Sequence, residues 1–296
     1  MKIAVFGADG FIGRHVVACL DDHEVFSMIR SKSANPGTLT VDLLDKNTVI
    51  TSLRQTRPDV VINCAGIVSN TDNVEHNSTF TNNILEAIHE LDIPVKRVII
   101  LGSAGEYGRV EHGNIPVDED VPLNAESGYG FSKLVEERNA HLLAKKYNIA
   151  LIVARIFNPI GKGMHPRFLI PQIIEQVHDL KAGKRETLEV NRLDARRDYV
   201  AVKDVAAAIK VLAISTPGHS IYNIGSGEAT SNKMLIDSVL SCMALNGSPE
   251  VIELSGRPEP NVAYQANITR IRTEFGWKPI RTVSEVIKEI IDASGY

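Results

Sequence analysis

The feature of this sequence that most constrains its fold is a regular alternation between two kinds of segment. Short runs of apolar and β-branched residues recur with little polar interruption, at Lys2–Phe6, Glu24–Ile29, Asp59–Asn63, Arg97–Leu101 and Ile149–Ala154. Between them lie segments with apolar residues at helical spacing, at Phe11–Leu20, Asp45–Gln55, Val74–Leu91 and Ser132–Tyr147. Continuous apolar runs are typical of strands that are covered on both faces. The alternation therefore predicts an α/β fold with a doubly wound parallel sheet.

The pattern loosens after Phe157, where prolines and glycines crowd the chain. We expect a first domain over residues 1–157 and a smaller one mainly over residues 158–296. Two later apolar runs, Tyr199–Val202 and Ser220–Ile224, are predicted strands, so the chain should rejoin the first domain at about residues 199–225. Helices are predicted at Thr269–Phe275 and Thr282–Ala293. The second domain is therefore expected to be an interleaved C-terminal α/β unit.

Composition argues against several classes of function. Lys plus Arg total 32 and Asp plus Glu total 36, which gives a formal net charge of −4 without a basic run, so nucleic acid is not an expected partner. No apolar run approaches membrane-spanning length, so no membrane contact is expected. Cys19, Cys64 and Cys242 are widely separated, which is typical of a reducing compartment. The histidines show no ligand spacing. We expect a cytoplasmic protein without a metal site.

The first predicted strand leads into a glycine-rich turn. Gly7, Gly10 and Gly13 follow one another at intervals of three residues, with Phe11 and Ile12 inside the turn, and a predicted helix comes next. Glycines at these positions let backbone N–H groups approach a pyrophosphate at the start of a helix. We therefore predict that these residues bind a dinucleotide and that the first domain is a dinucleotide-binding domain. An ordinary strand-to-helix turn is the alternative.

The end of the second predicted strand bears on which dinucleotide binds. An acidic residue there accepts hydrogen bonds from the adenosine ribose of NAD, whereas a 2′-phosphate favours a guanidinium. This sequence has Arg30 at that point and Lys32 just beyond it. We predict that Arg30 binds the 2′-phosphate with help from Lys32, which favours NADPH, although basic residues after a strand are also common as plain surface. Asp42 and Leu43 are predicted near the adenine, with a turn-capping aspartate as the alternative.

Three residues far apart in the sequence predict the chemistry. Ser103 follows a predicted strand, and Tyr129 and Lys133 lie four residues apart in a predicted helical region. Four residues advance a helix by about 400°, so these two side chains share one face. An ammonium group favours the phenolate, so we expect Lys133 to lower the pKa of Tyr129 and Ser103 to hold the reacting oxygen. A tyrosine and a lysine on an exposed helix are the alternative.

In order and spacing these motifs resemble the extended short-chain dehydrogenase/reductase superfamily. The resemblance is carried by Gly7-x-x-Gly10-x-x-Gly13, Asn63-Cys64-Ala65-Gly66, Ser103-Ala104-Gly105-Glu106-Tyr107-Gly108 and Tyr129-Gly130-Phe131-Ser132-Lys133. Later segments are similar to its nucleotide-sugar epimerases, dehydratases and reductases, namely Arg155-Ile156-Phe157-Asn158-Pro159-Ile160-Gly161, Arg197-Asp198-Tyr199-Val200, Tyr222-Asn223-Ile224-Gly225 and Phe275-Gly276-Trp277-Lys278-Pro279. The resemblance implies a Rossmann fold whose cofactor site also includes Ala65, Gly66, Tyr129 and Lys133.

The resemblance also implies the substrate class, a nucleotide-diphosphate sugar held mainly by the second domain. Asn158 would donate to the diphosphate or the sugar, Arg197 would neutralise the diphosphate, Arg257 would lie near the nucleoside, and Ser103 would contact the sugar. A guanidinium fork suits two adjacent phosphates. Relatives of this kind form homodimers, and we expect a homodimer here through the predicted helices Val74–Leu91 and Ser132–Tyr147. Packing in the core of a single chain explains the apolar faces of these helices equally well.

Three chemistries compete within this group. Its dehydratases carry an Asp-Glu pair after the serine or threonine, where this sequence has Ala104 and Gly105, so elimination lacks its acid and base. Glu106 stands one position later, where an apolar residue is usual, and receives no catalytic role. Epimerases retain NAD, whereas a net reductase consumes NADPH, which fits Arg30. The segment Phe157–Val177 also resembles reductases of nucleotide-linked 4-keto-6-deoxyhexoses. We predict such an NADPH-dependent 4-keto reductase; the alternatives are an NAD-dependent nucleotide-sugar 4-epimerase and, more remotely, a non-catalytic dinucleotide-binding regulator.

Overall fold

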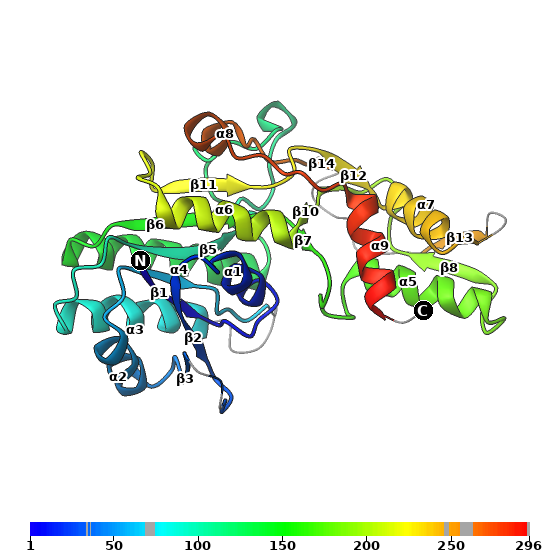
Figure 1. The fold of residues 1–296 in the computed structure, drawn as a ribbon. Coiled ribbons are helices and arrows are strands. Elements are labelled where there is room, and N and C mark those ends of the chain that lie inside the picture. Colours follow the sequence, from blue (N-terminus) through cyan, green and yellow to red (C-terminus); the bar gives the residue numbers. More distant parts are fainter. Residues whose placement is uncertain (34, 36, 69–74, 246–248, 255–262, 295–296) are drawn as a thin grey trace.

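A computed structural model describes residues 1–33, 35, 37–68, 75–245, 249–254 and 263–294 (Figure 1). Its helices are α1 (Gly13–Cys19), α2 (Lys46–Thr56), α3 (His76–Glu90), α4 (Gly128–Tyr147), α5 (Leu169–Lys181), α6 (Val202–Ile214), α7 (Asn232–Cys242), α8 (Thr269–Phe275) and α9 (Val283–Ser294), with short 3-10 turns η1 (Ala104–Glu106) and η2 (His112–Asn114). Its strands are β1 (Lys2–Phe6), β2 (Glu24–Ile29), β3 (Thr38–Thr40), β4 (Val60–Asn63), β5 (Arg97–Ser103), β6 (Leu151–Ile156), β7 (Pro159–Ile160), β8 (Thr187–Val190), β9 (Arg196–Asp198), β10 (Val200–Ala201), β11 (Ile221–Ile224), β12 (Ala229–Ser231), β13 (Glu250–Glu253) and β14 (Ala263–Tyr264).

Seven strands form one parallel sheet in the order β11-β6-β5-β4-β1-β2-β3. The chain builds outward from β1 to β3 on one side and then returns to β4 on the other side of β1. Phe6 is thus opposite Met28 of β2 and Asn63 of β4. Such a reversal parts the loops at the carboxyl ends of the strands and leaves room for a ligand. The predicted α/β doubly wound parallel sheet of the Rossmann type is confirmed.

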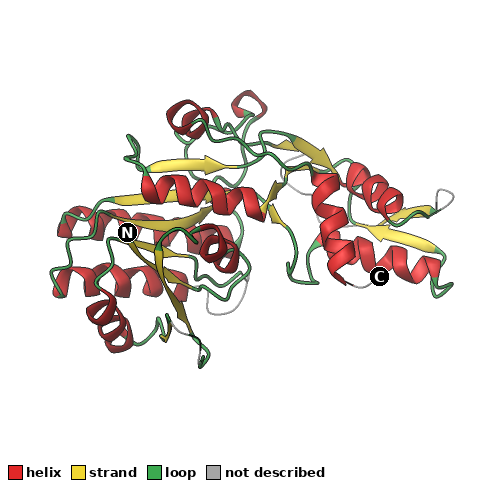
Figure 2. Cartoon of the chain, in the orientation of Figure 1, coloured by secondary structure: helices red, strands yellow, loops and turns green. Residues whose placement is uncertain are grey.

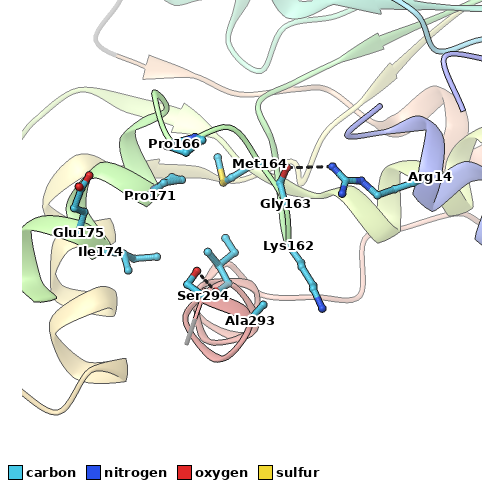
Figure 3. A pocket seen from close by; sticks show the side chains of 11 residues that line it. Arg14, Lys162, Gly163, Met164, Pro166, Pro171, Ile174, Glu175, Ala293 and Ser294 are labelled. Carbon is cyan, nitrogen blue, oxygen red and sulfur yellow. Dashed lines mark hydrogen bonds between the residues drawn. The ribbon is translucent and has the colours of Figure 1, made fainter. Parts of the chain in front are cut away.

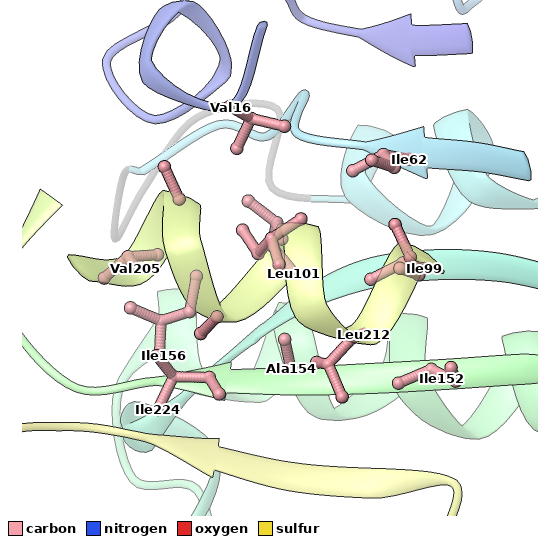
Figure 4. Close-up of a cluster of buried hydrophobic side chains, with 14 of the residues drawn as sticks. Val16, Ile62, Ile99, Leu101, Ile152, Ala154, Ile156, Val205, Leu212 and Ile224 are labelled. Carbon is pink, nitrogen blue, oxygen red and sulfur yellow. The ribbon is translucent and has the colours of Figure 1, made fainter. Parts of the chain in front are cut away.

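Alternate residues of the strands supply two hydrophobic cores, one on each face of the sheet. Ile3 and Val5 of β1 belong to a core covered by α1 and α6, whereas Ala4 and Phe6 belong to a core covered by α2, α3 and α4. Figure 4 shows the first core, in which Leu212 of α6 packs among residues of β5 and β6. Burial on both faces is the reason that the strands carry so few polar residues.

A smaller lobe holds α5, α7 and α9 with the parallel pair β8 and β13 (Figure 2). Its separate core includes Ile173, Leu235 and Ile287, which are all buried. The strand predicted at Tyr199–Val202 is shorter than expected, because only β10 is extended there, and it pairs with β7 instead of the large sheet. β11 does join the large sheet. The domain boundary at residue 157 stays a prediction.

Candidate active site

The carboxyl ends of the parallel strands bring many of the predicted site residues to one edge of the sheet. They are Gly7 after β1, Arg30 after β2, Ala65 after β4, Ser103 at the end of β5 and Asn158 after β6. Parallel strands point the same way, so positions distant in sequence become neighbours at this edge. Open α/β sheets bind their ligands there.

The glycine-rich turn after β1 leaves no room for side chains. Gly7 has a φ of +69°, and a Cβ on it would lie 2.6 Å from the backbone N of Ala65. A Cβ on Gly13 would lie 2.0 Å from the Gly7 carbonyl oxygen. Gly10 closes the turn by donating its N–H to that same oxygen at 3.0 Å. The loops after β1 and β4 therefore meet through bare backbone, which is the kind of surface that a pyrophosphate can approach.

Two cations follow β2 beside this turn. The side chains of Arg30 and Lys32 are exposed. Between them, the Ser31 hydroxyl donates to Asp9 Oδ2 at 3.5 Å, and Asp9 lies within the glycine-rich turn. This long bond ties the basic segment to the turn. Arg30 thus follows β2 close to the glycine-rich turn, and its contact with a 2′-phosphate stays a prediction.

The other residues predicted near the cofactor differ in burial and in hydrogen bonding. Asp42 Oδ1 accepts the N–H of Leu44 at 3.0 Å, so the turn-capping alternative describes what this carboxylate does here. Leu43 is buried in the core beneath α2 and α3. Phe11 and Ile12 are partly buried just before α1. The adenine contact of Asp42 and Leu43 stays a prediction.

Ser103, Tyr129 and Lys133 come together where η1 packs on α4. Tyr129 is hydrogen-bonded to Ser103, and the charge of Lys133 acts on the Tyr129 phenol. The approach depends on glycine, because a Cβ on Gly130 would lie 2.3 Å from the carbonyl oxygen of Gly105. Our sequence reasoning missed this contact, although the glycine that follows Tyr129 was its signal. Backbone touching backbone holds the phenol against the end of β5.

Lys133 lowers the pKa of Tyr129, as predicted, but the pKa nevertheless ends above its ordinary value. Burial raises the pKa of Tyr129, and the Lys133 charge and the Ser103 hydrogen bond offset only part of that rise. Lys133 is itself buried and forms an ion pair with Glu136. Desolvation disfavours the ammonium, but the neighbouring acidic groups, Glu136 foremost, together raise the pKa of Lys133 above its ordinary value. The same carboxylate raises the pKa of Tyr129.

A chain of buried hydrogen bonds fixes Lys133 through this carboxylate. The Thr81 hydroxyl of α3 donates to Glu136 Oε1 at 2.6 Å and accepts from Asn63 Nδ2 at 3.0 Å. Asn63 Oδ1 in turn accepts the Ala65 N–H at 3.1 Å. The loop after β4, helix α3 and helix α4 are thus joined behind Lys133. The bonds of Thr81 to Asn63 and to Glu136 could not be inferred from local spacing, because the three residues come from separate elements.

A second asparagine links the same loop to the start of α4. Asn77 Oδ1 accepts the Ile67 N–H at 2.7 Å, and its Nδ2 donates to the Ile67 carbonyl at 3.1 Å and to Ser132 Oγ at 3.2 Å. Ser132 Oγ donates to the Tyr129 carbonyl oxygen at 2.8 Å. Gly66 passes close by, since a Cβ on it would lie 3.6 Å from Asn77 Oδ1. The loop predicted to bind the cofactor is therefore connected to the turn of helix that carries Tyr129.

The predicted substrate residues lie toward the smaller lobe. Asn158 Nδ2 donates to the Asp198 carbonyl oxygen at 2.8 Å. Arg197, the residue before Asp198, is opposite Tyr264 in the pairing of β9 with β14. The Tyr264 hydroxyl donates into the turn that follows β5, where the carbonyl oxygens of Ala104 and Gly108 lie 2.8 Å and 3.1 Å from it. The predicted residue Arg257 lies outside the described residues.

A surface hollow lies between α1, α5 and α9 (Figure 3). Arg14 and Lys162 line one side of it, and Arg14 Nη2 donates to the Gly163 carbonyl oxygen at 3.2 Å. No residue that the sequence assigned to the cofactor or substrate is among the described residues that line it. The contact ties α1 to the loop that follows β7.

The described part of the chain contains no group of three or more His, Cys, Asp or Glu residues placed to hold a metal ion. None of its helices has the length and the apolar character needed to cross a membrane.

Comparison with known protein families matches residues 3–225 to the NAD dependent epimerase/dehydratase family. The chain belongs to this family. The match covers the glycine-rich turn and three of the predicted active-site residues, Ser103, Tyr129 and Lys133. Family membership confirms the resemblance stated from the motifs, and it makes the protein an NAD(P)-dependent enzyme of the extended short-chain dehydrogenase/reductase type.

Several members of the epimerase/dehydratase family are similar to this chain over nearly its whole length. The dTDP-6-deoxy-L-talose 4-dehydrogenase (NAD(P)(+)) of Kitasatospora kifunensis is 27% identical, with 98% of this chain and 94% of that protein covered. The GDP-6-deoxy-D-mannose reductase of Pseudomonas aeruginosa is 26% identical, with 98% and 96% covered. The crystal structure of Thermus thermophilus UDP-glucose 4-epimerase with NAD is 26% identical and has a TM-score of 0.83. The match covers 99% of this chain and 98% of that one.

Proposed function

We propose that this family member is an NADPH-dependent reductase of the 4-keto group of a nucleotide-linked 4-keto-6-deoxyhexose. The observation that carries the choice of a reductase is Arg30, which is exposed directly after β2 beside the glycine-rich turn. A guanidinium suits the 2′-phosphate of NADPH, a cofactor that net reduction consumes. The two relatives named as a 4-dehydrogenase and a 6-deoxymannose reductase support the same sugar chemistry.

The residues around the glycine-rich turn fit a dinucleotide. Cβ atoms on Gly7 and Gly13 would collide with backbone, so the turn presents backbone without side chains at these positions, which a pyrophosphate can approach closely. We infer that the cofactor is held by Gly7, Gly10, Phe11, Ile12, Gly13, Arg30, Lys32, Ala65 and Gly66, with Tyr129 and Lys133 at the nicotinamide ribose. When bound, NADPH supplies the hydride for the carbonyl carbon.

Tyr129 would supply the proton. Burial raises the pKa of this phenol, which keeps it protonated at neutral pH, the form that a proton donor requires. Ser103, which is hydrogen-bonded to Tyr129, would hold the C4 oxygen of the sugar while its charge develops. The Lys133 ammonium would stabilise the phenolate that remains.

The anionic end of the substrate would bind toward the smaller lobe. Arg197 would neutralise the diphosphate and Asn158 would donate to it, with Arg257 near the nucleoside. Tyr264, which is opposite Arg197, donates a hydrogen bond to the carbonyl oxygen of Ala104, the residue after Ser103. A diphosphate bound at Arg197 is thereby set in a defined relation to Ser103, and such positioning is a large part of catalysis.

Turnover with a panel of 4-keto-6-deoxy nucleotide sugars tests the proposal. We expect loss of NADPH absorbance and, by NMR, a product with a new hydroxyl at C4. Tyr129→Phe should still bind NADPH but turn over slower by orders of magnitude. Turnover that survives this change would remove Tyr129 as the acid.

The cofactor preference is tested separately through Arg30. Wild type and Arg30→Ala are compared for kcat/KM with NADPH and with NADH. We expect the variant to lose most of the preference for NADPH, because the 2′-phosphate loses a bidentate partner. Equal discrimination in both proteins would show that Arg30 does not select the cofactor.

A 4-epimerase is the second candidate, and the Thermus thermophilus enzyme with NAD favours it. An epimerase would carry NAD through purification and convert one nucleotide hexose into its 4-epimer without net loss of cofactor. The same NMR assay separates the two outcomes. A non-catalytic regulator would give neither. The homodimer and the cytoplasmic location stay predictions.

A further inference from the structure

A buried carboxyl lies beneath the Ser103 end of the site. The Glu106 side chain at the end of η1 is 0% exposed. Its Oε1 accepts the Ser103 N–H at 2.5 Å, and Ser103 Oγ accepts the Gly105 N–H at 3.1 Å. These reciprocal bonds form a capping box that closes the turn. The backbone of Ser103 is therefore held by Glu106.

Glu106 meets a second carboxyl, that of Glu137 in α4, within hydrogen-bonding reach. Arg155 of β6 grips Glu137 with two bonds, from Nε to Oε2 at 3.0 Å and from Nη2 to Oε1 at 2.6 Å. Arg155 Nε lies 3.9 Å from Glu106 Oε2. Adjacent buried carboxyls share a proton, and the negative charge belongs with the one that the guanidinium binds. Burial and Glu137 accordingly raise the pKa of Glu106.

The contacts of Glu106 favour its protonated form. Without a proton, Glu106 Oε2 has no hydrogen-bond partner among the described residues. A proton on Oε2 would donate to Glu137 and remove that deficit. Gly102, the residue before Ser103, makes the space, because a Cβ there would lie 3.0 Å from Glu106 Oε1 and 3.1 Å from Arg155 Cγ.

The charge state of Glu106 matters to the phenol nearby. The titratable groups that face Glu106 are Glu137, Lys133 and Tyr129 of α4, Arg155 of β6 and Tyr264 of β14. An ionised Glu106 would place a further negative charge near Tyr129 and oppose the phenolate left after proton transfer. A neutral acid keeps the bond to Ser103 without that charge.

We propose that Glu106 is a positioning residue that works as a neutral carboxylic acid, anchoring Ser103 through one oxygen and hydrogen-bonding to Glu137 through the proton on the other. The inference rests on the proposed function, because anchoring Ser103 affects turnover only if Ser103 meets the substrate oxygen. Glu106 touches neither substrate nor cofactor in this role. It acts through Ser103.

Two variants and one control test the role in the full-length protein. Glu106→Gln keeps an acceptor for Ser103 and a donor for Glu137 without a titratable proton. Its kcat should stay within about threefold of wild type, and the alkaline limb of its kcat profile against pH should not move. Glu106→Ala should lose at least about tenfold in kcat, the equivalent of one lost hydrogen bond, with an unchanged Kd for NADPH. Asp204→Asn alters a buried carboxylate that bonds Arg281 and none of the proposed site residues in the described part of the chain, so it should leave kcat unchanged.

The proton itself is read by infrared spectroscopy, which needs no turnover. Wild type at neutral pH should show the carbonyl band of a protonated carboxyl that Glu106→Gln lacks. Absence of that band, a Gln variant as slow as the Ala variant, or an alkaline limb shifted to lower pH in Glu106→Gln would overturn the proposal. If no keto sugar is reduced, the proposed function fails while the infrared comparison still decides the state of Glu106.

Discussion

Thr81→Val is expected to loosen the buried bonds behind Lys133. Thr81 is 1% exposed, and its hydroxyl is hydrogen-bonded to both Glu136 and Asn63. Valine has nearly the same shape as threonine, so the change removes two hydrogen bonds and little packing. It leaves the amide of Asn63 and the carboxylate of Glu136 each short of one partner in a buried site.

The magnitude follows from those two bonds. A hydrogen bond to a charged group contributes about 1.5–3 kcal/mol, and a buried donor left without an acceptor costs about 1–3 kcal/mol, so we expect a loss of about 3–5 kcal/mol. Thr81→Ser keeps the hydroxyl and removes one methyl group, which costs about 1 kcal/mol. The serine variant is therefore the matched control.

Thermal unfolding measures the difference. Each kcal/mol shifts the Tm of a domain approaching this size by about 2–4 °C, so the valine variant should unfold about 10 °C below wild type and the serine variant within about 4 °C of it. Equal Tm values for the two variants would refute the reasoning, because they would show that the hydrogen bonds of the Thr81 hydroxyl contribute no more to stability than its methyl group does.

Two further predictions concern the turn and the buried acid. Gly13→Ala should cost more than about 3 kcal/mol and abolish NADPH binding in a fluorescence titration, because its Cβ would lie 2.0 Å from a backbone oxygen; Gly113→Ala, with no described atom within 4 Å of the new Cβ, should change neither. The raised pKa of Glu106 means that the folded chain keeps a proton that the unfolded chain has lost, so wild type loses about 1.4 kcal/mol of stability per pH unit above the unfolded pKa and Glu106→Gln does not. The variant should therefore gain stability relative to wild type as the pH rises from about 5 to about 7 in thermal unfolding, and an unchanged difference would contradict a protonated Glu106.

Local pattern was enough to predict the large sheet and the positions of the main site residues. The strand Lys2–Phe6 has the predicted bounds because a run of apolar residues covered on both faces has one stable arrangement. The helix face shared by Tyr129 and Lys133 follows from their spacing of four residues. Such features depend only on neighbours in the sequence, so the sequence determined them by itself.

The tertiary structure decided the electrostatics of the site. Glu106 received no role from its motif, yet it lies buried beneath Ser103 and beside Glu137, a residue on another element. Spacing predicted that Lys133 lowers the pKa of Tyr129, and its charge does so, but burial of the phenol raises that pKa by more. Burial and long-range partners have no local signature, since desolvation depends on everything that packs around a group. The sequence determined which groups meet at the sheet edge, and only the folded chain decided which of them carry charge.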